Sequence, residues 1–93
     1  MDNDEIRARI LYALARKRKW GESHTAYENM LKQFKSELLG REGMKLAGNM
    51  AEDLIREGLI GKKSTGAGLH VSLNPRRSQE IKRLIKEKLD ADI

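Results

Sequence analysis

The stretch 40–60 most constrains how this chain of 93 residues can fold. Its apolar residues recur at steps of three and four, which places them on one face of an α-helix. One face holds Ala47, Met50, Ala51, Leu54 and Ile55, and the opposite face holds Lys45, Gly48, Asn49, Glu52 and Arg56. The spacing predicts a helix over 43–57. Gly58 predicts a left-handed C-cap, after which Leu59 folds back onto the last turn.

A first helix is expected over 4–19. Asp2 or Asn3 can cap its start, and four consecutive cations, Arg16 to Lys19, suit the negative end of its dipole. Its apolar stripe is Ile6, Ile10, Leu11 and Leu14. The cluster of cations is interpreted either as a solvated helix end or as a phosphate-contacting group, and the two interpretations are compatible.

A second helix is expected over 26–39, because Thr25 and Glu28 have the spacing of a capping box. Its apolar stripe is Tyr27, Met30, Leu31, Phe34 and Leu38. Gly40 can close this helix in a left-handed conformation, so only a short turn separates it from the next one. Two apolar-striped helices joined in this way are typical of a helix-turn-helix.

After Gly58 the period of the sequence changes. Leu69, Val71 and Leu73 alternate with His70 and Ser72, which indicates a strand with one buried face. The preceding residues can pair back across Gly66-Ala67-Gly68, whose glycines suit a tight turn, so we expect a β-hairpin over 59–73. Asn74 and Pro75 predict the start of a last helix over 75–90. Its apolar stripe is Ile81, Leu84, Ile85 and Leu89.

Composition sets the class of partner. The net charge is +5 and the sequence pI is about 9.7, which favours a polyanion. The chain has no cysteine, which excludes disulfides and thiolate chemistry. We expect one domain over residues 1–93, without a signal peptide or membrane-spanning segment, and a cytoplasmic location.

The residues do not suggest an enzyme. The two histidines, His24 and His70, are expected in a connector and in a strand, without the spacing of a catalytic triad or a metal site. Glu52 and Asp53 are adjacent, so on a helix they diverge by about 100° and cannot form an acid–base pair. We therefore expect no catalytic residues, no metal and no cofactor.

The segment from the predicted helix into the hairpin is the part of the chain most typical of one fold family. It consists of Leu54-Ile55-Arg56-Glu57-Gly58-Leu59-Ile60, then Lys62-Lys63, the glycine tip, and 69–75. With the order helix, helix, helix, hairpin, helix, these residues resemble the winged helix-turn-helix superfamily. The chain looks like the small archaeal and bacterial transcription regulators of the MarR-like and ArsR-like kinds, from about Ile6 to Leu89. The resemblance implies a mainly α fold with a small β-hairpin: a three-helix core, a wing and a C-terminal helix.

The resemblance also implies double-stranded DNA as the partner and transcription regulation as the role. The helix over 43–57 would enter the major groove and the wing would lie on the backbone. The expected DNA-binding residues are Arg41, Lys45, Gly48, Asn49, Lys62, Lys63, His70, Arg76 and Arg77. Lys45 can read guanine and Asn49 adenine, whereas the wing cations meet phosphates or the minor groove. Gly48 and Asn49 let the helix backbone approach its target closely.

Two alternatives to DNA binding stay open, and so does the dimer interface. Residues 41–57 carry three cations and four anions, so the helix is not a basic rod, and a protein-interaction module on the same scaffold is the second candidate. RNA binding is weaker, because four aromatic residues give few stacking platforms. A homodimer is expected through the first helix, the last helix or both, since the last helix could pack either on the first or on its twin.

Overall fold

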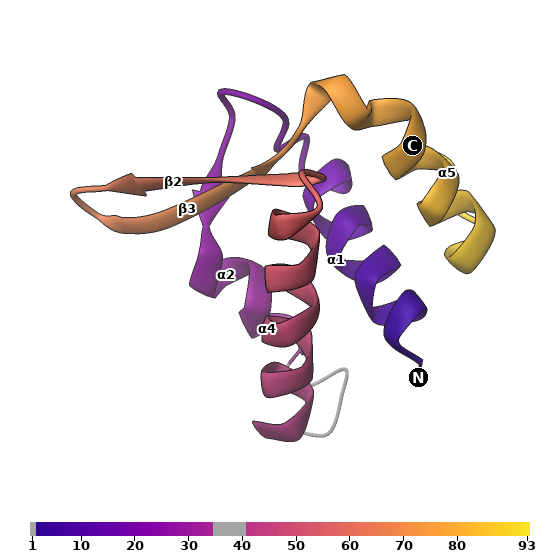
Figure 1. Cartoon of the computed structure of the whole chain (residues 1–93), viewed down its shortest axis with the longest axis horizontal. Helices are drawn as coiled ribbons and strands as arrows, with labels where there is room; N and C mark the ends of the chain where they lie inside the picture. Colours follow the sequence, from indigo (N-terminus) through magenta and orange to yellow (C-terminus); the bar gives the residue numbers. More distant parts are fainter. Residues whose placement is uncertain (1, 35–40) are drawn as a thin grey trace.

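The structure is a computed structural model, and it describes residues 2–34 and 41–93 (Figure 1). These residues form a mainly helical fold with one small antiparallel sheet. The elements are α1 (Asn3–Arg16), β1 (Thr25–Ala26), α2 (Tyr27–Lys32), α4 (Arg41–Arg56), β2 (Ile60–Thr65), β3 (Gly68–Leu73), η1 (Pro75–Arg77) and α5 (Ser78–Leu89).

The sheet has the order β1-β3-β2. The hairpin predicted over 59–73 is confirmed: β2 pairs with β3 from Ile60↔Leu73 to Thr65↔Gly68. The predicted glycine tip is confirmed in part, because Gly68 has a φ of +117° whereas Gly66 does not have a positive φ.

The strand β1 was not predicted. Thr25 pairs with Val71 on the free edge of β3, so the threonine lies in the sheet and not at a helix start. The helix α2 begins after Ala26, which makes no side-chain capping bond, so the predicted capping box is wrong. Within the predicted range 26–39, α2 ends at Lys32, and Leu38 and the proposed closing Gly40 lie outside the described residues.

The first helix is shorter than predicted. Asp2 caps it as expected, with Oδ1 accepting from the Glu5 amide at 2.7 Å, but α1 ends at Arg16 and not at Lys19. Arg18 is left-handed, with a φ of +58°, and this turn brings the Lys19 carbonyl to the Leu73 amide at 2.7 Å. Three of the four consecutive cations therefore lie beyond the helix.

The long helix α4 carries the centre of the fold and begins at Arg41, two residues before the predicted start. Its predicted C-cap is confirmed. Gly58 has a φ of +81° and its amide donates to the Ile55 carbonyl, while the Leu59 amide donates to the Leu54 carbonyl. This pair of bonds is the Schellman arrangement, and it turns the chain directly into β2.

The core lies between α1, α4, α5 and the inner face of the sheet. Its most buried large side chains are Phe34, Ile6, Ile10, Leu11, Leu14, Leu54, Leu59, Ile60, Leu73, Ile81, Ile85 and Val71. The last helix of the chain packs against α1, on the side away from α4 (Figure 1). Ile81 and Ile85 are fully buried there, so the predicted apolar stripe of α5 is used inside the chain.

The predicted start of the last helix is confirmed in a modified form. Asn74 Oδ1 accepts from the Arg76 amide, but the first turn, η1, is a 3-10 helix, and α5 follows it from Ser78 to Leu89. Asn74 Nδ2 also donates to the Gly58 carbonyl at 2.9 Å. The side chain of Asn74 therefore joins the end of α4 to the start of the last helical segment.

A second connection joins α1 to the same turn. Arg7 makes two hydrogen bonds of 2.6 Å with the carboxylate of Glu57, the residue that follows α4. The hydrogen bond from Arg7 lowers the pKa of Glu57; burial opposes this shift, and the charges of Arg7, Arg77 and Arg56 add to it. The end of α4 is thus fixed to both α1 and η1.

We expect this pair to make stability depend on pH. Since the pKa of Glu57 is lowered in the fold, its contribution is complete above the unfolded value of 4.5 and is lost as pH falls through the folded value. The carboxylate is 45% exposed, so the contribution is at most about 1 kcal/mol. Urea denaturation of Glu57→Gln should show a weaker loss of unfolding free energy below pH 4.5 than the parent chain. Glu28→Gln, which removes an exposed carboxylate of α2, is the control; an equal weakening in both variants would contradict the assignment.

Candidate nucleic-acid interface

The first half of α4 presents its polar side to solvent. Arg41, Lys45 and Asn49 are exposed, and they follow one another at four-residue steps along one side of the helix. The opposite side carries the buried residues Gly43, Ala47, Met50, Ala51 and Leu54. Figure 1 shows that this half of α4 extends away from the sheet. The surface formed by Arg41, Lys45 and Asn49 is called the reading surface below.

Gly48 does not belong to the reading surface. A Cβ added at this glycine would lie 3.9 Å from Leu31 Cδ1, so Gly48 faces α2. This distance is an ordinary van der Waals contact, and the glycine is not required by packing. The close approach to a target predicted at Gly48 is therefore not found, because this residue faces another helix of the chain at an ordinary packing distance.

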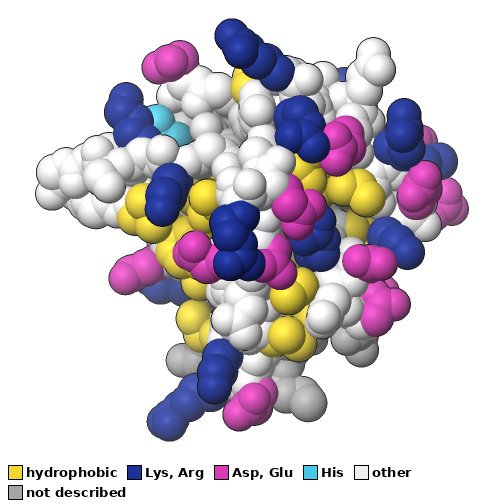
Figure 2. Space-filling model, viewed as in Figure 1, with side chains coloured by type: hydrophobic (Ala, Val, Ile, Leu, Met, Phe, Trp, Pro, Cys, Tyr) yellow, Lys and Arg dark blue, Asp and Glu magenta, His cyan; other side chains and the backbone are white. Residues whose placement is uncertain are grey.

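The acidic residues in the second half of α4 and directly after it are engaged within the fold. Asp53 forms an ion pair with Arg56, and Glu57 is held by Arg7. Glu52 accepts a hydrogen bond from the Tyr27 hydroxyl at 3.4 Å. Burial raises the pKa of Tyr27, and the charge of Glu52 and this hydrogen bond raise it further. Side chains of both charges are interspersed over this face of the molecule (Figure 2).

The two hairpin lysines point to opposite faces of the sheet, because side chains alternate along a strand. Lys62 lies opposite Val71, which is buried, so Lys62 is on the inner face, the side of the helices. Lys63 lies opposite His70 and is on the outer face. The predicted wing site is therefore divided, and only Lys62 lies on the side of the sheet that faces α4.

His70 is paired with His24, a contact that the sequence did not suggest. The two Nδ1 atoms are 2.8 Å apart and the rings meet edge to face, with centroids separated by 4.7 Å. This contact depends on β1, which brings residue 24 beside β3. No local signal in the sequence identifies β1, so the proximity of the two histidines could not be found without the fold.

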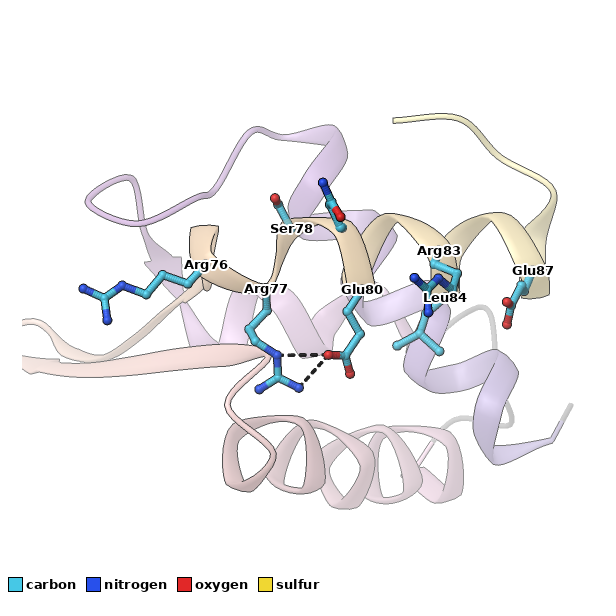
Figure 3. Close-up of a pocket in the computed structure, with 8 residues that line it drawn as sticks. Arg76, Arg77, Ser78, Glu80, Arg83, Leu84 and Glu87 are labelled. Atoms are coloured by element: carbon cyan, nitrogen blue, oxygen red, sulfur yellow. Dashed lines mark hydrogen bonds and ion pairs between the residues drawn. The ribbon is translucent and has the colours of Figure 1, made fainter.

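The two arginines of η1 have different roles. Arg77 Nε and Nη2 donate to Glu80 at 3.0 and 2.7 Å, and Nη1 donates to the Glu57 carbonyl at 2.9 Å (Figure 3). Arg77 therefore closes the end of α4 and has little freedom to contact DNA. Arg76 is exposed and extends away from Arg77 (Figure 3). A surface hollow of about 750 Å³ along η1 and α5 is lined by Arg76, Arg77, Ser78, Gln79, Glu80, Arg83, Leu84 and Glu87.

Residues 2–34 and 41–93 contain no group of three or more histidine, aspartate or glutamate side chains placed to hold a metal ion. None of the helices in these two ranges has the length and apolar content needed to cross a membrane. Comparison of the chain with known protein families, curated proteins and solved structures found no match.

Proposed function

We propose that the chain is a winged helix-turn-helix domain that binds double-stranded DNA as a transcription regulator. The reading surface carries this proposal: Lys45 and Asn49 are exposed one turn apart on the part of α4 that extends from the fold. Residues 41–49 carry Arg41 and Lys45 against Glu42, a positive balance, and the other three anions between 41 and 57 lie in the second half and are engaged in contacts within the chain.

The order of the elements supports the same proposal. Helix, strand, helix, helix and hairpin follow one another, and β1 joins the outer edge of β3. The hairpin extends sideways from the C-terminal end of α4 (Figure 1).

In the proposed mechanism, some residues supply the affinity for DNA and others supply the sequence specificity. Arg41 and Lys62 neutralise phosphates, which gives most of the affinity and makes it dependent on salt. Asn49 donates to and accepts from an adenine edge, and Lys45 binds a guanine edge. Arg76 remains a candidate phosphate contact, whereas His70 and Arg77 are engaged by contacts inside the fold and Gly48 faces α2.

Fluorescence anisotropy with a random duplex pool, followed by selection of the bound sequences, tests the proposal directly. Binding at low salt that weakens linearly with the logarithm of salt concentration is expected. Asn49→Ala should lower the discrimination at one position of the selected site by about 1–3 kcal/mol. Asn29→Ala, a change of the same residue type on exposed α2, should leave the discrimination unchanged. If no duplex binds at low salt, the proposal fails.

A protein-interaction module is the second candidate, and one observation favours it. Half-exposed apolar side chains, Leu46 and Ile55, border the charged side of α4. A protein partner would cover this apolar border as well as the charges, so its binding would weaken with Leu46→Ser and depend little on salt. DNA binding would show the opposite behaviour.

A homodimer and a cytoplasmic location remain proposals. The apolar stripe of the last helix no longer supports a dimer, because α5 packs this stripe against α1 of the same chain. Of the large apolar side chains in the described residues, only Ile93 is classed as exposed, at 42%. Light scattering of the free chain and of its DNA complex gives the number of chains, and two chains would require a palindromic site.

A further inference from the structure

We propose that His24 and His70 form a binding site for a first-row transition-metal ion such as Zn²⁺, Ni²⁺ or Cu²⁺. Their Nδ1 atoms converge at 2.8 Å from two segments of the chain, the lead into β1 and the middle of β3. Both side chains are part-buried, so the sheet limits the orientations of the two rings. The site is independent of nucleic-acid binding.

The geometry is close to that of two ligands on one ion. Zinc–imidazole bonds of about 2.0–2.1 Å at a near-tetrahedral angle place two ligand nitrogens about 3.4 Å apart. The observed separation has to widen by about half an ångström, which small side-chain rotations supply. Without an ion, one Nδ1 carries a proton and donates a hydrogen bond to the other Nδ1, because two bare lone pairs would repel. Metal binding requires this ring to adopt the tautomer with its proton on Nε2, so that both Nδ1 lone pairs face the ion.

The surroundings leave room for the remaining ligands. His24 and His70 line a hollow of about 180 Å³ with Glu22, Gly61 and Ser72. Gly61 has no side chain to fill this space, and the exposed Glu22 also lines it without forming a three-ligand group with the two histidines. Two imidazoles with water in the other positions suit zinc, nickel and copper, whereas magnesium and calcium prefer oxygen ligands.

One lysine side chain on the same face opposes a cation. Lys63 is the cross-strand neighbour of His70, whereas the side chain of Lys62, although this residue borders the hollow, lies on the opposite face of the sheet. Lys63 is exposed, so its charged end is solvated and screened. It weakens the site without blocking it, and we expect binding in the micromolar range.

Calorimetry with ZnCl₂ or NiCl₂ at neutral pH, in a non-coordinating buffer and with the whole chain, tests the site. Saturable binding is expected, together with amide chemical-shift changes centred on residues 24 and 70. His24→Gln and His70→Gln should each weaken binding at least tenfold, while magnesium should give no saturable signal. Folding of each variant is checked by circular dichroism, and the shift map of the parent chain supplies an independent readout.

Lys63→Met is the matched control, because it keeps both imidazoles and removes one opposing charge. It should bind the same ion with an affinity higher by about two- to tenfold. Absence of saturable binding to the parent chain, shift changes centred elsewhere, or unchanged affinity in both folded histidine variants would overturn the proposal. If the parent chain shows no saturable binding, the contact between the histidines is only a hydrogen bond between the two rings.

Discussion

Replacing Leu54 with Ala is expected to lower the free energy of unfolding by about 2–5 kcal/mol. The Leu54 side chain is fully buried, and its carbonyl accepts the Leu59 amide at the turn between α4 and β2. Truncation removes apolar contacts and leaves a cavity at the point where α4 meets the sheet. Since a chain of this length is stabilised by roughly 5–14 kcal/mol, the loss is a large fraction of the total. Urea denaturation followed by circular dichroism measures it.

The adjacent residue supplies the control. Ile55 is only partly buried, on the border of the exposed side of α4, so Ile55→Ala should cost clearly less than Leu54→Ala. An equal loss in the two variants would contradict the placement of Leu54 at the centre of the core. It would also contradict the orientation of the reading surface, because one rotation of α4 about its axis places Leu54 in the core and the reading surface toward solvent.

The second large effect concerns DNA binding. Neutralising Arg41, Lys45 and Lys62 together, each by substitution with Gln, should weaken binding to any duplex by roughly 10²–10³-fold at about 0.1 M salt. The slope of log affinity against log salt should fall in magnitude by about 1.8, because Arg41 and Lys62 each lose a phosphate contact that contributes about 0.9. The reason is that these three cations belong to the extended half of α4 and to the helix side of the hairpin.

A charge-matched variant separates this surface from net charge alone. Lys82, Lys86 and Lys88 are exposed on α5, which lies beyond α1 from α4 (Figure 1). Substituting these three with Gln lowers the net charge by the same amount and should leave the salt slope nearly unchanged. The same slope change in both triple variants would mean that DNA binding is diffuse, and that the reading surface is not the contact.

The features that the sequence predicted are those with local causes. The helix over 43–57, the left-handed Gly58 and the alternation of Val71 and Leu73 each follow from residues within a few positions of one another. Helix ends were less accurate: α1 stops at Arg16 because the chain must turn to place Lys19 beside Leu73. That contact spans more than fifty positions and leaves no trace in the local pattern.

The candidate site shows the same contrast between features with local causes and features that depend on distant residues. Exposure of Lys45 and Asn49 was predictable from helical periodicity, and the structure agrees. The roles of Arg77 and His70 were not predictable, because each depends on a partner far along the chain, the Glu57 carbonyl and His24. Strand β1 is two residues long and exists because β3 offers it a free edge.

The alternation of Lys62 and Lys63 across the hairpin limits how the length of this segment can change. One residue inserted within β2, before Lys62, would exchange the faces of every following side chain in that strand up to the tip. Lys62 would then lie on the same side of the sheet as the histidines, and the residue that takes its place would face the core beside Val71. Residues added in equal number to both strands at the tip, beside Gly66 and Ala67, would keep the existing register. Elongation of this hairpin is therefore tolerated only at its end.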